Sequence, residues 1–551
     1  MEKKCSQCGQ KFEITQDDLA FYEKVSPEIG GKKYLIPPPT LCPECRQQQR
    51  FAFRNEWKFY HRKCDQSGKQ LISIYSPDKP YKVYEPVIWW SDVYDPLSYG
   101  RAFDFSRPFF EQFAELNRKV PKSAIQNANS ENCDYTNYSA ENKNCYLVIG
   151  GLGARDCLYS YRVFYSSDLV DCYDLIKCER CYECSESDGL HSSSYCSNSS
   201  NCSDCVLCDN CIGCRDCFGC ANLRNKRFHI YNTPFTEAEY RKKIATLRPG
   251  DPAIRRDIEK LHKTVPHRFA RLIQCESSTG DQLLECQRCT DSYTLKHSQD
   301  CRFCAIGEND RDCMDANFFD NSELLYQSTN LEKNYHILFS VLVWYSKECM
   351  YCMNCFNSQN LFGCSGMKKH RYSILNKQYS KEEYENLVPK IIEHMKKTGE
   401  WAQFFPPSIS PFGYNETIAQ EYYPLNKSEA IKCELQWHDE EMTQEKYLGP
   451  AITIPDISDA DDSICQKILT CDVTGKPYKI IPQELKFYRE MNIPIPRKCP
   501  DQRHKERMAQ RNPRKLWKRE CMKCKKEIQT TYSPERSETV LCEPCYLETI
   551  Y

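Results

Sequence analysis

Eight cysteines near the two ends of the chain are spaced as ligands of a metal ion. They form four Cys-x2-Cys pairs, and a two-residue gap allows both sulfur atoms of a pair to face one ion. Two pairs supply four thiolates, a set that suits tetrahedral Zn²⁺. We predict two Zn²⁺ ions, one at each end, with metal-free thiols as the alternative. The predicted ligands are Cys5, Cys8, Cys42 and Cys45 at the N-terminal end and Cys521, Cys524, Cys542 and Cys545 at the C-terminal end.

The two ends resemble each other, which indicates an internal duplication. With Cys45 aligned on Gln502, residues 5–90 match residues 471–547, so each end has room for two metal sites. Each end has kept one site and lost part of the other. The incomplete site of the second copy retains Cys471, Thr474, Cys499 and Gln502, and that of the first copy retains Cys64 and Ser67.

The residues that follow the ligands indicate two kinds of zinc module. The Cys42–Cys45 pair opens a helical pattern, which is typical of a treble clef and places the thiolates at a helix N-terminus. The C-terminal site is more similar to a zinc ribbon.

Each end also carries five basic residues at strict four-residue spacing. Residues four apart share one face of a helix, so the spacing predicts a basic ridge over 46–62 and another over 503–519. Such ridges suit a phosphate backbone, and we expect RNA rather than DNA. The alternatives are a solvated helix face and a ridge that binds the acidic stretch 439–462. The ridge residues are Arg46, Arg50, Arg54, Lys58 and Arg62, and Arg503, Arg507, Arg511, Lys515 and Arg519.

Composition limits the function classes. The 551 residues include 75 Lys and Arg against 76 Asp and Glu, a formal charge of −1, which excludes a wholly basic nucleic-acid-binding protein but not local basic patches. The most apolar stretch, residues 337–345, is too short to span a bilayer, and residues 1–5 begin no signal peptide. We therefore expect a cytoplasmic protein without membrane contact. Its 38 cysteines are then reduced thiols, with extracellular disulfides as the alternative.

The central part of the chain contains cysteines in a three-residue period. Fifteen cysteines between Cys133 and Cys220 fall in one phase, and the same phase is otherwise filled mainly by Ser, Leu, Val, Gly and Ala, with Asn142 as a polar exception. This period fits neither an α-helix nor a simple strand. It predicts a thin β-solenoid with inward positions at every third residue and coils of twelve or fifteen residues. Asn or Asp often precedes Cys, as at Asn132 and Asn144, where it would form left-handed corners.

A second array repeats the first at an offset of 144 residues. It runs from Cys286 to Cys364, with Asp310 as its one charged member. Each array ends in a strand and a helix that begins with a capping box, at Thr236 and Ser380, and we expect these helices to cap the solenoid ends. Core thiols are the preferred interpretation of the arrays. A metal store, an iron–sulfur scaffold or a redox reservoir is the alternative.

The whole chain resembles an uncharacterised family of cysteine-rich, zinc-motif proteins from uncultivated bacteria with small genomes. Some relatives carry a CaiB/BaiF, CoA-transferase-type label, but the matching residues support no such chemistry, and the resemblance implies no known activity. The cysteines missing near Ser67 and Glu85 depart from the fuller zinc set of the family. Besides the Cys-x2-Cys ends, the matching segments are Arg54–Glu56, Phe103–Phe110, Asn376–Tyr384 and Arg511–Arg514.

These patterns predict a mixed α+β chain in which two homologous zinc modules flank a duplicated solenoid with helical caps. No nucleotide-binding or nucleophile motif is found, so we lean against an enzyme. The leading hypothesis is a zinc-binding scaffold whose basic helices bind nucleic acid, for example within a ribonucleoprotein. A thiol-rich metal or redox protein and a protein-interaction platform are the alternatives. The expected segments are a zinc module (1–92), an aromatic linker (93–128), solenoid 1 (129–235), a helical insert (236–272), solenoid 2 (273–379), a helix (380–398), an extended linker (399–465) and a zinc module (466–551).

Overall fold

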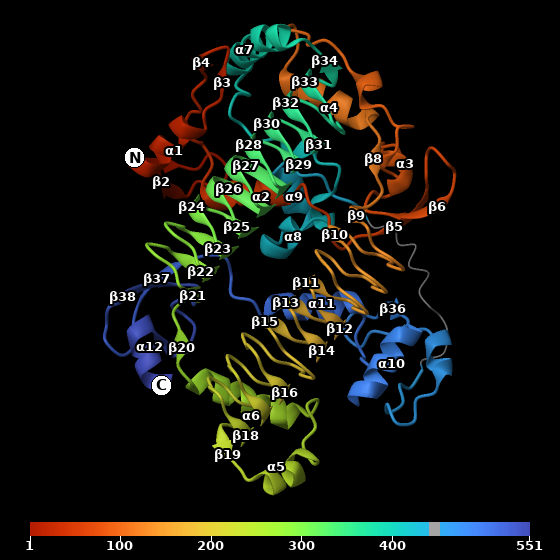
Figure 1. Cartoon of the computed structure of the whole chain (residues 1–551), viewed down its shortest axis with the longest axis vertical. Coiled ribbons are helices and arrows are strands. Elements are labelled where there is room, and N and C mark those ends of the chain that lie inside the picture. Colours follow the sequence, from red (N-terminus) through yellow and green to blue (C-terminus); the bar gives the residue numbers. More distant parts are fainter. Residues whose placement is uncertain (440–451, 551) are drawn as a thin grey trace.

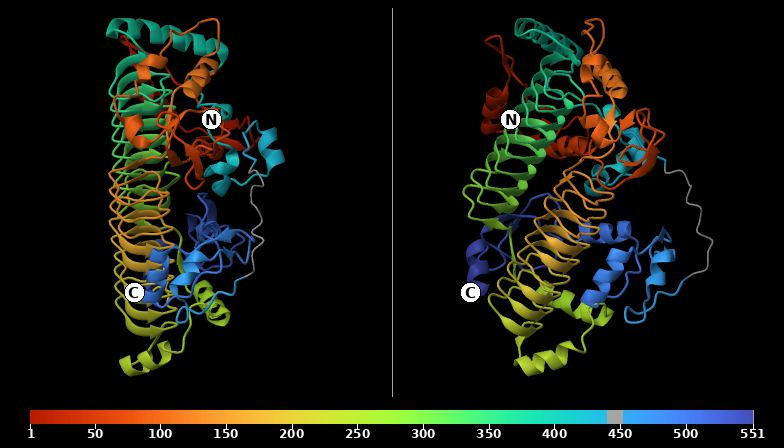
Figure 2. Two further views of the ribbon diagram at one scale, coloured as in Figure 1. Left: turned by 90° about the vertical axis from the view of Figure 1, so that its right-hand side faces the viewer. Right: turned by 45° about the vertical axis from the view of Figure 1, so that its right-hand side comes forward.

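Two β-solenoids form the centre of the protein in a computed structural model that describes residues 1–439 and 452–550. Solenoid 1 and solenoid 2 run in opposite directions and are joined at one end by helices α5 (Glu237–Ile244) and α6 (Pro252–Thr264) (Figures 1 and 2). The predicted duplicated solenoid is therefore confirmed.

Short parallel strands form the coils. In solenoid 1 they are β9 (Asn127–Ala128), β10 (Ser139–Ala140), β11 (Tyr161–Phe164), β12 (Ser167–Val170), β13 (Tyr173–Ile176), β14 (Glu179–Tyr182), β15 (Ser185–Asp188), β16 (Ser203–Val206), β17 (Arg215–Phe218) and β18 (Arg227–Ile230). In solenoid 2 they are β21 (Leu272–Ile273), β22 (Gly280–Leu284), β23 (Ser292–Lys296), β24 (Gln299–Arg302), β25 (Ala305–Glu308), β26 (Arg311–Asp320), β27 (Glu323–Glu332), β28 (Tyr335–Leu338), β29 (Val341–Trp344), β30 (Lys347–Met350), β31 (Met353–Phe356), β32 (Gln359–Phe362) and β33 (Arg371–Ile374).

Each coil has twelve residues and four sides. Bridges recur every three residues and pair each residue with the one twelve positions later, as in Glu131↔Lys143. The fifteen-residue coil expected from some cysteine spacings is wrong, because Cys157 and Cys172 are one coil and one further side apart. The first coil of solenoid 2 is shorter, since Leu272 pairs with Leu283. In the next coil, position 280 requires glycine. Its φ is +143°, and a Cβ there would lie 1.8 Å from the carbonyl oxygen of Ser292.

The corners adopt the left-handed conformation at every third residue. Asn132, Asn144 and Asp156 have φ of 51°, 55° and 52°, and each precedes an inward cysteine. Asn and Asp tolerate this conformation better than most residues, so the sequence signal for the corners is confirmed.

The inward thiols and hydroxyls hydrogen-bond to the backbone of the coils. Cys205 Sγ donates to the carbonyl oxygens of Ser203 and Cys214, at 3.3 and 3.7 Å. Ser187 Oγ donates to Ser185 O at 2.7 Å and accepts from the amide of Ser199 at 3.0 Å. Small donors therefore satisfy carbonyl groups in a core that is too thin for larger polar groups.

Asn142 and Asp310, the polar exceptions named from the sequence, join the same pattern, as does Asn334, whose Oδ1 accepts from the amide of Ser346 at 3.0 Å. Asn142 Oδ1 accepts from the amide of Ala154 at 2.9 Å, and Asp310 Oδ1 accepts from the amide of Ser322 at 2.9 Å. Burial raises the pKa of Asp310 well above its ordinary value. We infer that an acceptor facing a backbone amide is what allows Asn or Asp at an inward position.

Helices cap the solenoids as expected. Solenoid 1 ends in the antiparallel pair β18–β19 (Thr233–Pro234) and α5, and solenoid 2 ends in β33–β34 (Lys377–Gln378) and α7 (Lys381–Thr398) (Figure 1). Both capping boxes form, with Thr236 accepting from Glu239 N and Ser380 accepting from Glu383 N.

The two end modules share one order of elements, apart from the hairpin of β3 (Glu28–Ile29) and β4 (Lys32–Lys33), which is present only in the N-terminal module. The N-terminal module contains β1 (Glu2–Lys4), β2 (Lys11–Glu13), α1 (Gln16–Val25), β3 (Glu28–Ile29), β4 (Lys32–Lys33), α2 (Pro43–Phe51), β5 (Tyr60–Lys63), β6 (Gln70–Ser73), β7 (Val83–Tyr84) and α3 (Pro86–Trp90). The C-terminal module contains β35 (Leu469–Thr470), β36 (Pro477–Tyr478), α10 (Pro482–Met491), α11 (Pro500–Ala509), β37 (Trp517–Glu520), β38 (Glu527–Thr530), β39 (Val540–Leu541) and α12 (Glu543–Ile550). The duplication inferred from sequence thus appears in the order of elements.

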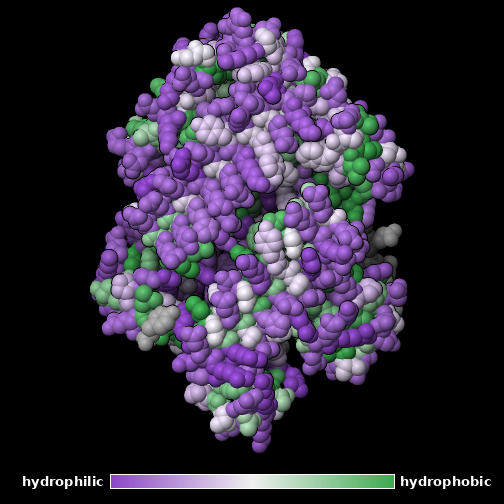
Figure 3. Space-filling model, in the orientation of Figure 1, coloured by the Kyte–Doolittle hydropathy of each residue, from purple (hydrophilic) through white to green (hydrophobic). Residues whose placement is uncertain are grey.

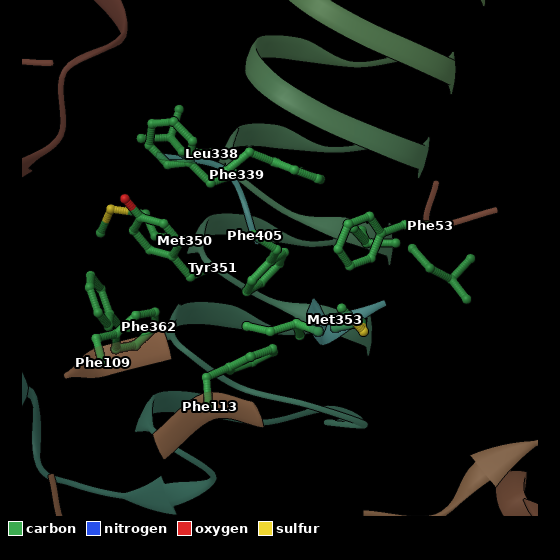
Figure 4. Close-up of a cluster of buried hydrophobic side chains, with 14 of the residues drawn as sticks. Phe53, Phe109, Phe113, Leu338, Phe339, Met350, Tyr351, Met353, Phe362 and Phe405 are labelled. Carbon is green, nitrogen blue, oxygen red and sulfur yellow. The ribbon is translucent and has the colours of Figure 1, made fainter. Parts of the chain in front are cut away.

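Rows of apolar side chains on the outside of solenoid 2 hold the N-terminal part of the chain. Phe339 and Tyr351, one coil apart, stack at 4.9 Å, and the segment after α7 adds Phe405 (Figure 4). The aromatic linker contributes α4 (Phe109–Lys119), in which Phe113 stacks on Phe405 at 4.7 Å. This cluster provides an apolar core outside the thin solenoid.

Other linker elements are short. They are β8 (Lys122–Ser123), β20 (His267–Arg268), α8 (Ala419–Tyr422), α9 (Lys427–Lys432), and the 3-10 turns η1 (Pro96–Tyr99), η2 (Pro407–Ile409), η3 (Tyr414–Glu416) and η4 (Asp462–Gln466). Hydrophilic residues cover most of the face in Figure 3. Within residues 1–439 and 452–550, no helix combines the length and apolar character needed to cross a bilayer.

We expect a pH-dependent contribution from Lys122, which is fully buried beside α4. Its Nζ donates to Asn117 Oδ1 at 2.5 Å and Ser365 Oγ at 3.3 Å, and burial lowers its pKa to about 7. From pH 7 to the ordinary lysine pKa of about 10.4, the unfolded chain binds more protons than the folded chain, so this contribution to stability rises with pH.

Lys122→Met should therefore raise the free energy of unfolding at pH 6, by on the order of a few kcal/mol, and lose that advantage near pH 10. Chemical denaturation across this range measures the difference, with exposed Lys119→Met as the control. If the difference in unfolding free energy between Lys122→Met and the unchanged protein did not vary with pH, the expectation that Lys122 is neutral in the folded protein at high pH would be wrong.

Candidate metal centres and arginine contacts

Four of the predicted ligands meet in the N-terminal module. Cys5 and Cys8 lie in the turn between β1 and β2, and Cys42 and Cys45 lie at the start of α2. Their sulfur atoms all lie within 4.8 Å of one another, and Cys8 Sγ is 3.7 Å from Cys42 Sγ. The local sequence explains the placement, because Pro43 suits the first turn of a helix. This group could hold a metal ion.

The other four predicted ligands meet in the C-terminal module. Cys521 and Cys524 lie in the turn between β37 and β38, and Cys542 and Cys545 lie at the start of α12. Their sulfur atoms again lie within 4.8 Å of one another, with 3.5 Å between Cys524 and Cys542. Both groups thus combine the turn of a hairpin with a helix N-terminus, although they come from different halves of the duplicated module.

In each group the surroundings of some ligands lower the thiol pKa and favour the thiolate, the form that binds metal, whereas hydrogen bonds to neighbouring cysteines raise the pKa of others, among them Cys45 and Cys545. Burial would raise the pKa of Cys521, but backbone hydrogen bonds from residues that include Cys524 and Cys542 outweigh it and lower the pKa to about 6. In the other group, the side-chain hydrogen bond with Cys45 lowers the pKa of Cys42 to about 5. Four thiolates leave no open coordination position, which is the pattern of structural rather than catalytic zinc.

The incomplete sites keep their shape without a full set of ligands. Thr474 Oγ1 lies 3.8 Å from Cys499 Sγ, where the first copy has two cysteines. In the first copy, Cys64 Sγ accepts from the amides of Ser67 and Glu85, both at 3.4 Å. Protein hydrogen bonds therefore occupy the turns that lost their ligands.

The cysteine arrays form no third group of this kind. Across the described part of the chain, only the two four-cysteine groups bring three or more ligand atoms within 4.8 Å. No described cysteine forms a disulfide, and the array thiols lie in the solenoid cores. This distribution favours core thiols over the metal store considered from the sequence.

The two long basic helices expected from the sequence are wrong. Helix α2 ends at Phe51 and α11 ends at Ala509, so only the first two ridge residues of each copy are helical. After α2, Asn55 closes a turn through hydrogen bonds to Lys58 N and O. In the second copy, Pro513 prevents continuation of a helix.

Arg46 and Arg50 are buried against one aspartate of solenoid 2. Arg46 Nε lies 2.7 Å and Arg50 Nη1 3.3 Å from the carboxylate of Asp315, and all three side chains are at most 2% exposed. Arg50 Nε also donates to Asn317 Oδ1 at 2.8 Å, and Arg46 Nη1 to Leu41 O at 2.7 Å. These two arginines are therefore not available on a nucleic-acid-binding surface.

The second copy makes the equivalent contact with solenoid 1. Arg503 and Arg507 lie 3.0 and 2.7 Å from the carboxylate of Asp171, and Glu484 lies 3.2 Å from Arg503. Asp171 and Asp315 are 144 residues apart, the offset between the two arrays. Each module thus docks at the same place on a solenoid, the N-terminal module on solenoid 2 and the C-terminal module on solenoid 1.

Aromatic contacts repeat the correspondence. Tyr22 of α1 packs on Tyr326 with ring centroids 5.5 Å apart, and Tyr488 of α10 packs on Tyr182 at 5.9 Å. Tyr182 and Tyr326 are also 144 residues apart. The duplication therefore extends to the interfaces between modules and solenoids.

The third arginine of each copy is enclosed by rings. The Arg54 guanidinium lies 3.7 Å from the ring centre of Tyr138 and 3.9 Å from that of Phe318, so it contacts both solenoids. It also pairs with Glu56 at 2.6 Å. Arg511 donates to Tyr422 Oη at 2.7 Å.

The outer ridge residues also contact their own surroundings. Arg62 donates to Tyr81 O at 3.1 Å, and Arg519 donates to Ser533 O at 3.2 Å. Lys515 lies 3.4 Å from Glu44 of the other module, and Lys58 also has an interaction partner. The ten residues form no continuous ridge.

The described residues of the acidic stretch 439–462, which are Asp439 and residues 452–462, form no ion pair with the ridges. Its described ends pair elsewhere, Asp439 with Lys427 and Asp462 with Arg489. Residues 440–451 lie outside the described part of the chain.

Each module also pairs a strand with the segment that enters the other solenoid. Strand β7 pairs in parallel with β8, just before solenoid 1, and β39 pairs in parallel with β20, just before solenoid 2. Each module therefore contacts both solenoids.

Sequence reasoning missed the carboxylates that receive the arginines. The Asn or Asp pattern marks Asp171, which precedes Cys172, only as a corner residue, and it does not include Asp315, which precedes Ala316. Two carboxylates at the same position of both arrays were the available signal. No protein-family model matches the chain, and the search of curated proteins found no significant match.

We expect Asp315→Ala to destabilise the protein by about 3–5 kcal/mol, because it leaves two buried guanidinium groups without their carboxylate. Asp171→Ala should act similarly in the other half. Chemical denaturation measures both effects. The control is Glu131→Ala, which removes an exposed pair with Lys143 at 3.1 Å and should cost less than about 1 kcal/mol. Equal effects of all three changes would contradict the role of the buried contacts.

Proposed function

We propose that the two four-cysteine groups bind Zn²⁺ and that the chain is a non-catalytic scaffold whose two metal-bound modules fix an antiparallel pair of solenoids. The observation that carries this proposal is the repeated insertion of two arginines against one buried solenoid aspartate. Helix α2 begins at the ligands Cys42 and Cys45 and immediately presents Arg46 and Arg50 to Asp315. An ion at the start of this helix would therefore fix the position of the arginines.

The C-terminal site supports a different contact of the same scaffold. Strand β39 lies between its two ligand pairs and joins β20 at the junction of the solenoids. Beside it, Arg268 forms a two-point ion pair with Glu543, the residue that follows Cys542. Zinc in this group would hold the junction together. The hairpin-and-helix arrangement of both groups supports treble-clef-like modules at both ends.

Nucleic-acid binding through the ridges is not part of this proposal. Arg46, Arg50, Arg503 and Arg507 already have carboxylate partners in the solenoids, and exposing them would cost these contacts. A thiol reservoir is also disfavoured, because thiols such as Cys205 are buried and hydrogen-bonded. The family resemblance of the sequence adds no activity.

Metal analysis of protein purified without oxygen tests the proposal. We expect about two zinc ions per chain, about one after Cys8→Ser with Cys45→Ser, and about one after Cys521→Ser with Cys524→Ser. The matched control changes Cys471 and Cys499 of the incomplete site to Ser and should retain two. Many more metal ions, or an iron–sulfur absorption band, would contradict the proposal.

Removing zinc should also loosen the docking of the modules. After treatment with a chelator, we expect faster amide hydrogen exchange in α2 and in β37–β38, and smaller changes in the middle of solenoid 2, because metal ligation stabilises the modules locally. Unchanged exchange in both modules after complete removal of zinc would contradict the structural role of the ions.

A further inference from the structure

A cavity of about 910 Å³ lies where solenoid 1, α6, the start of solenoid 2 and the C-terminal module meet. In Figure 1 these elements lie in the lower left part of the view, where β15, β21, α6 and α12 are labelled. The volume is in the range of sites that enclose a small organic ligand. The cavity is not lined by the cysteines of the two metal centres, and the docking of the modules does not require an open space of this size.

The lining of the cavity is strongly basic. Nine Lys and Arg side chains line it against five Asp and Glu. Some of the basic groups are neutralised, as in the pairs Lys263–Glu259 at 2.7 Å and Arg507–Asp171 at 2.7 Å. Arg255, Arg271 and Arg514, in contrast, have no carboxylate oxygen within 4.0 Å among the described residues. The cavity therefore favours an anion.

Two buried donors at the wall have no acceptor. Arg514 Nη1 and Arg507 Nε are enclosed but make no hydrogen bond with the described part of the protein. Leaving such a donor unsatisfied is costly, and both belong to side chains that line the cavity. The donor atoms themselves are enclosed, so a ligand would reach them only after these two side chains shift toward the cavity.

Tyrosines complete the lining. The guanidinium of Arg514 lies 4.6 Å from the ring centre of Tyr422, and that of Arg255 lies 4.0 Å from the ring centre of Tyr195. Six tyrosines line the cavity in all. Arginines bind phosphate oxygens in pairs of hydrogen bonds, and tyrosine rings offer stacking surfaces for a planar base.

From this combination we infer a binding site for a free nucleotide, with its phosphates at Arg271 and Arg514 and its base against the tyrosines. The inference goes beyond the proposed scaffold and does not depend on zinc. The other half of the molecule has a different residue at the key position, since Trp57 aligns with Arg514. The extra guanidinium is thus specific to the C-terminal module.

Isothermal titration of the full-length zinc-loaded protein with AMP, ADP, ATP and inorganic phosphate tests this site. We expect ATP to bind more tightly than AMP, and the double variant Arg271→Gln with Arg514→Gln to weaken ATP binding by at least about tenfold, since charged hydrogen bonds are lost. The matched control, Lys518→Gln with Lys526→Gln, removes the same charge at exposed positions outside the cavity and should bind ATP as the wild type does.

A second variant separates loss of nucleotide binding from misfolding. Arg514→Trp installs the residue that the other module has at this position, and it should also weaken ATP binding while two zinc ions remain bound. The inference is overturned if no nucleotide binds at millimolar concentration, if the control pair loses as much affinity as the cavity pair, or if a short single-stranded oligonucleotide binds and ATP does not compete with it. Zinc content separates these outcomes from failure of the scaffold proposal.

Discussion

Two arginines of each end module share one buried solenoid aspartate, and the arrangement of the modules depends on this contact. Desolvating a guanidinium is costly, so the pair is stable only where a carboxylate and further acceptors meet it. At Asp315, Asn317 Oδ1 and Leu41 O accept from the arginines, and at Asp171 the second carboxylate is Glu484. A shift by one coil would replace Asp315 with Phe303 or Gln327, neither of which carries a charge. The contact therefore fixes the position of the module along the solenoid.

Because a coil of twelve residues has a thin core, each solenoid depends on contacts with other parts of the chain. Four sides of three residues leave one inward side chain per side, so each coil buries little apolar surface of its own. Thiols and hydroxyls fit this space because they fill a small volume and also donate to carbonyl groups. Much of the larger apolar surface lies outside the coils, in rows such as Leu338, Met350 and Phe362, each one coil from the next (Figure 4). These rows need a cover, and the modules and linkers supply it.

The sequence predicted what repeats locally. The period of three, the offset of 144 and the Asn or Asp corners followed from residue types, and the Cys-x2-Cys pairs named eight cysteines that the structure brings together in two groups. The four-residue spacing of the arginines was misleading, because a short helix followed by a turn has the same spacing as one long helix. Burial of Arg46 depends on Asp315, which is 269 residues away in the sequence. The register of the coils decides whether this aspartate lies opposite the arginine. The cavity draws on segments from solenoid 1, the insert, solenoid 2 and the C-terminal module, so no local pattern reveals it.

The two modules have their complete four-cysteine groups in different halves, and each half makes a different contact with the solenoids. One half of a module presents arginines to one solenoid, and the other half pairs a strand with the entry to the other solenoid. The N-terminal module has kept its ligands at the arginine helix, and the C-terminal module has kept them at the paired strand. In the other half of each module, hydrogen bonds such as those from Ser67 and Glu85 to Cys64 hold the turn. Because the two halves of a module are joined and docked together, a metal ion in one complete site would anchor a whole module, and ions in the two remaining sites would support both kinds of contact.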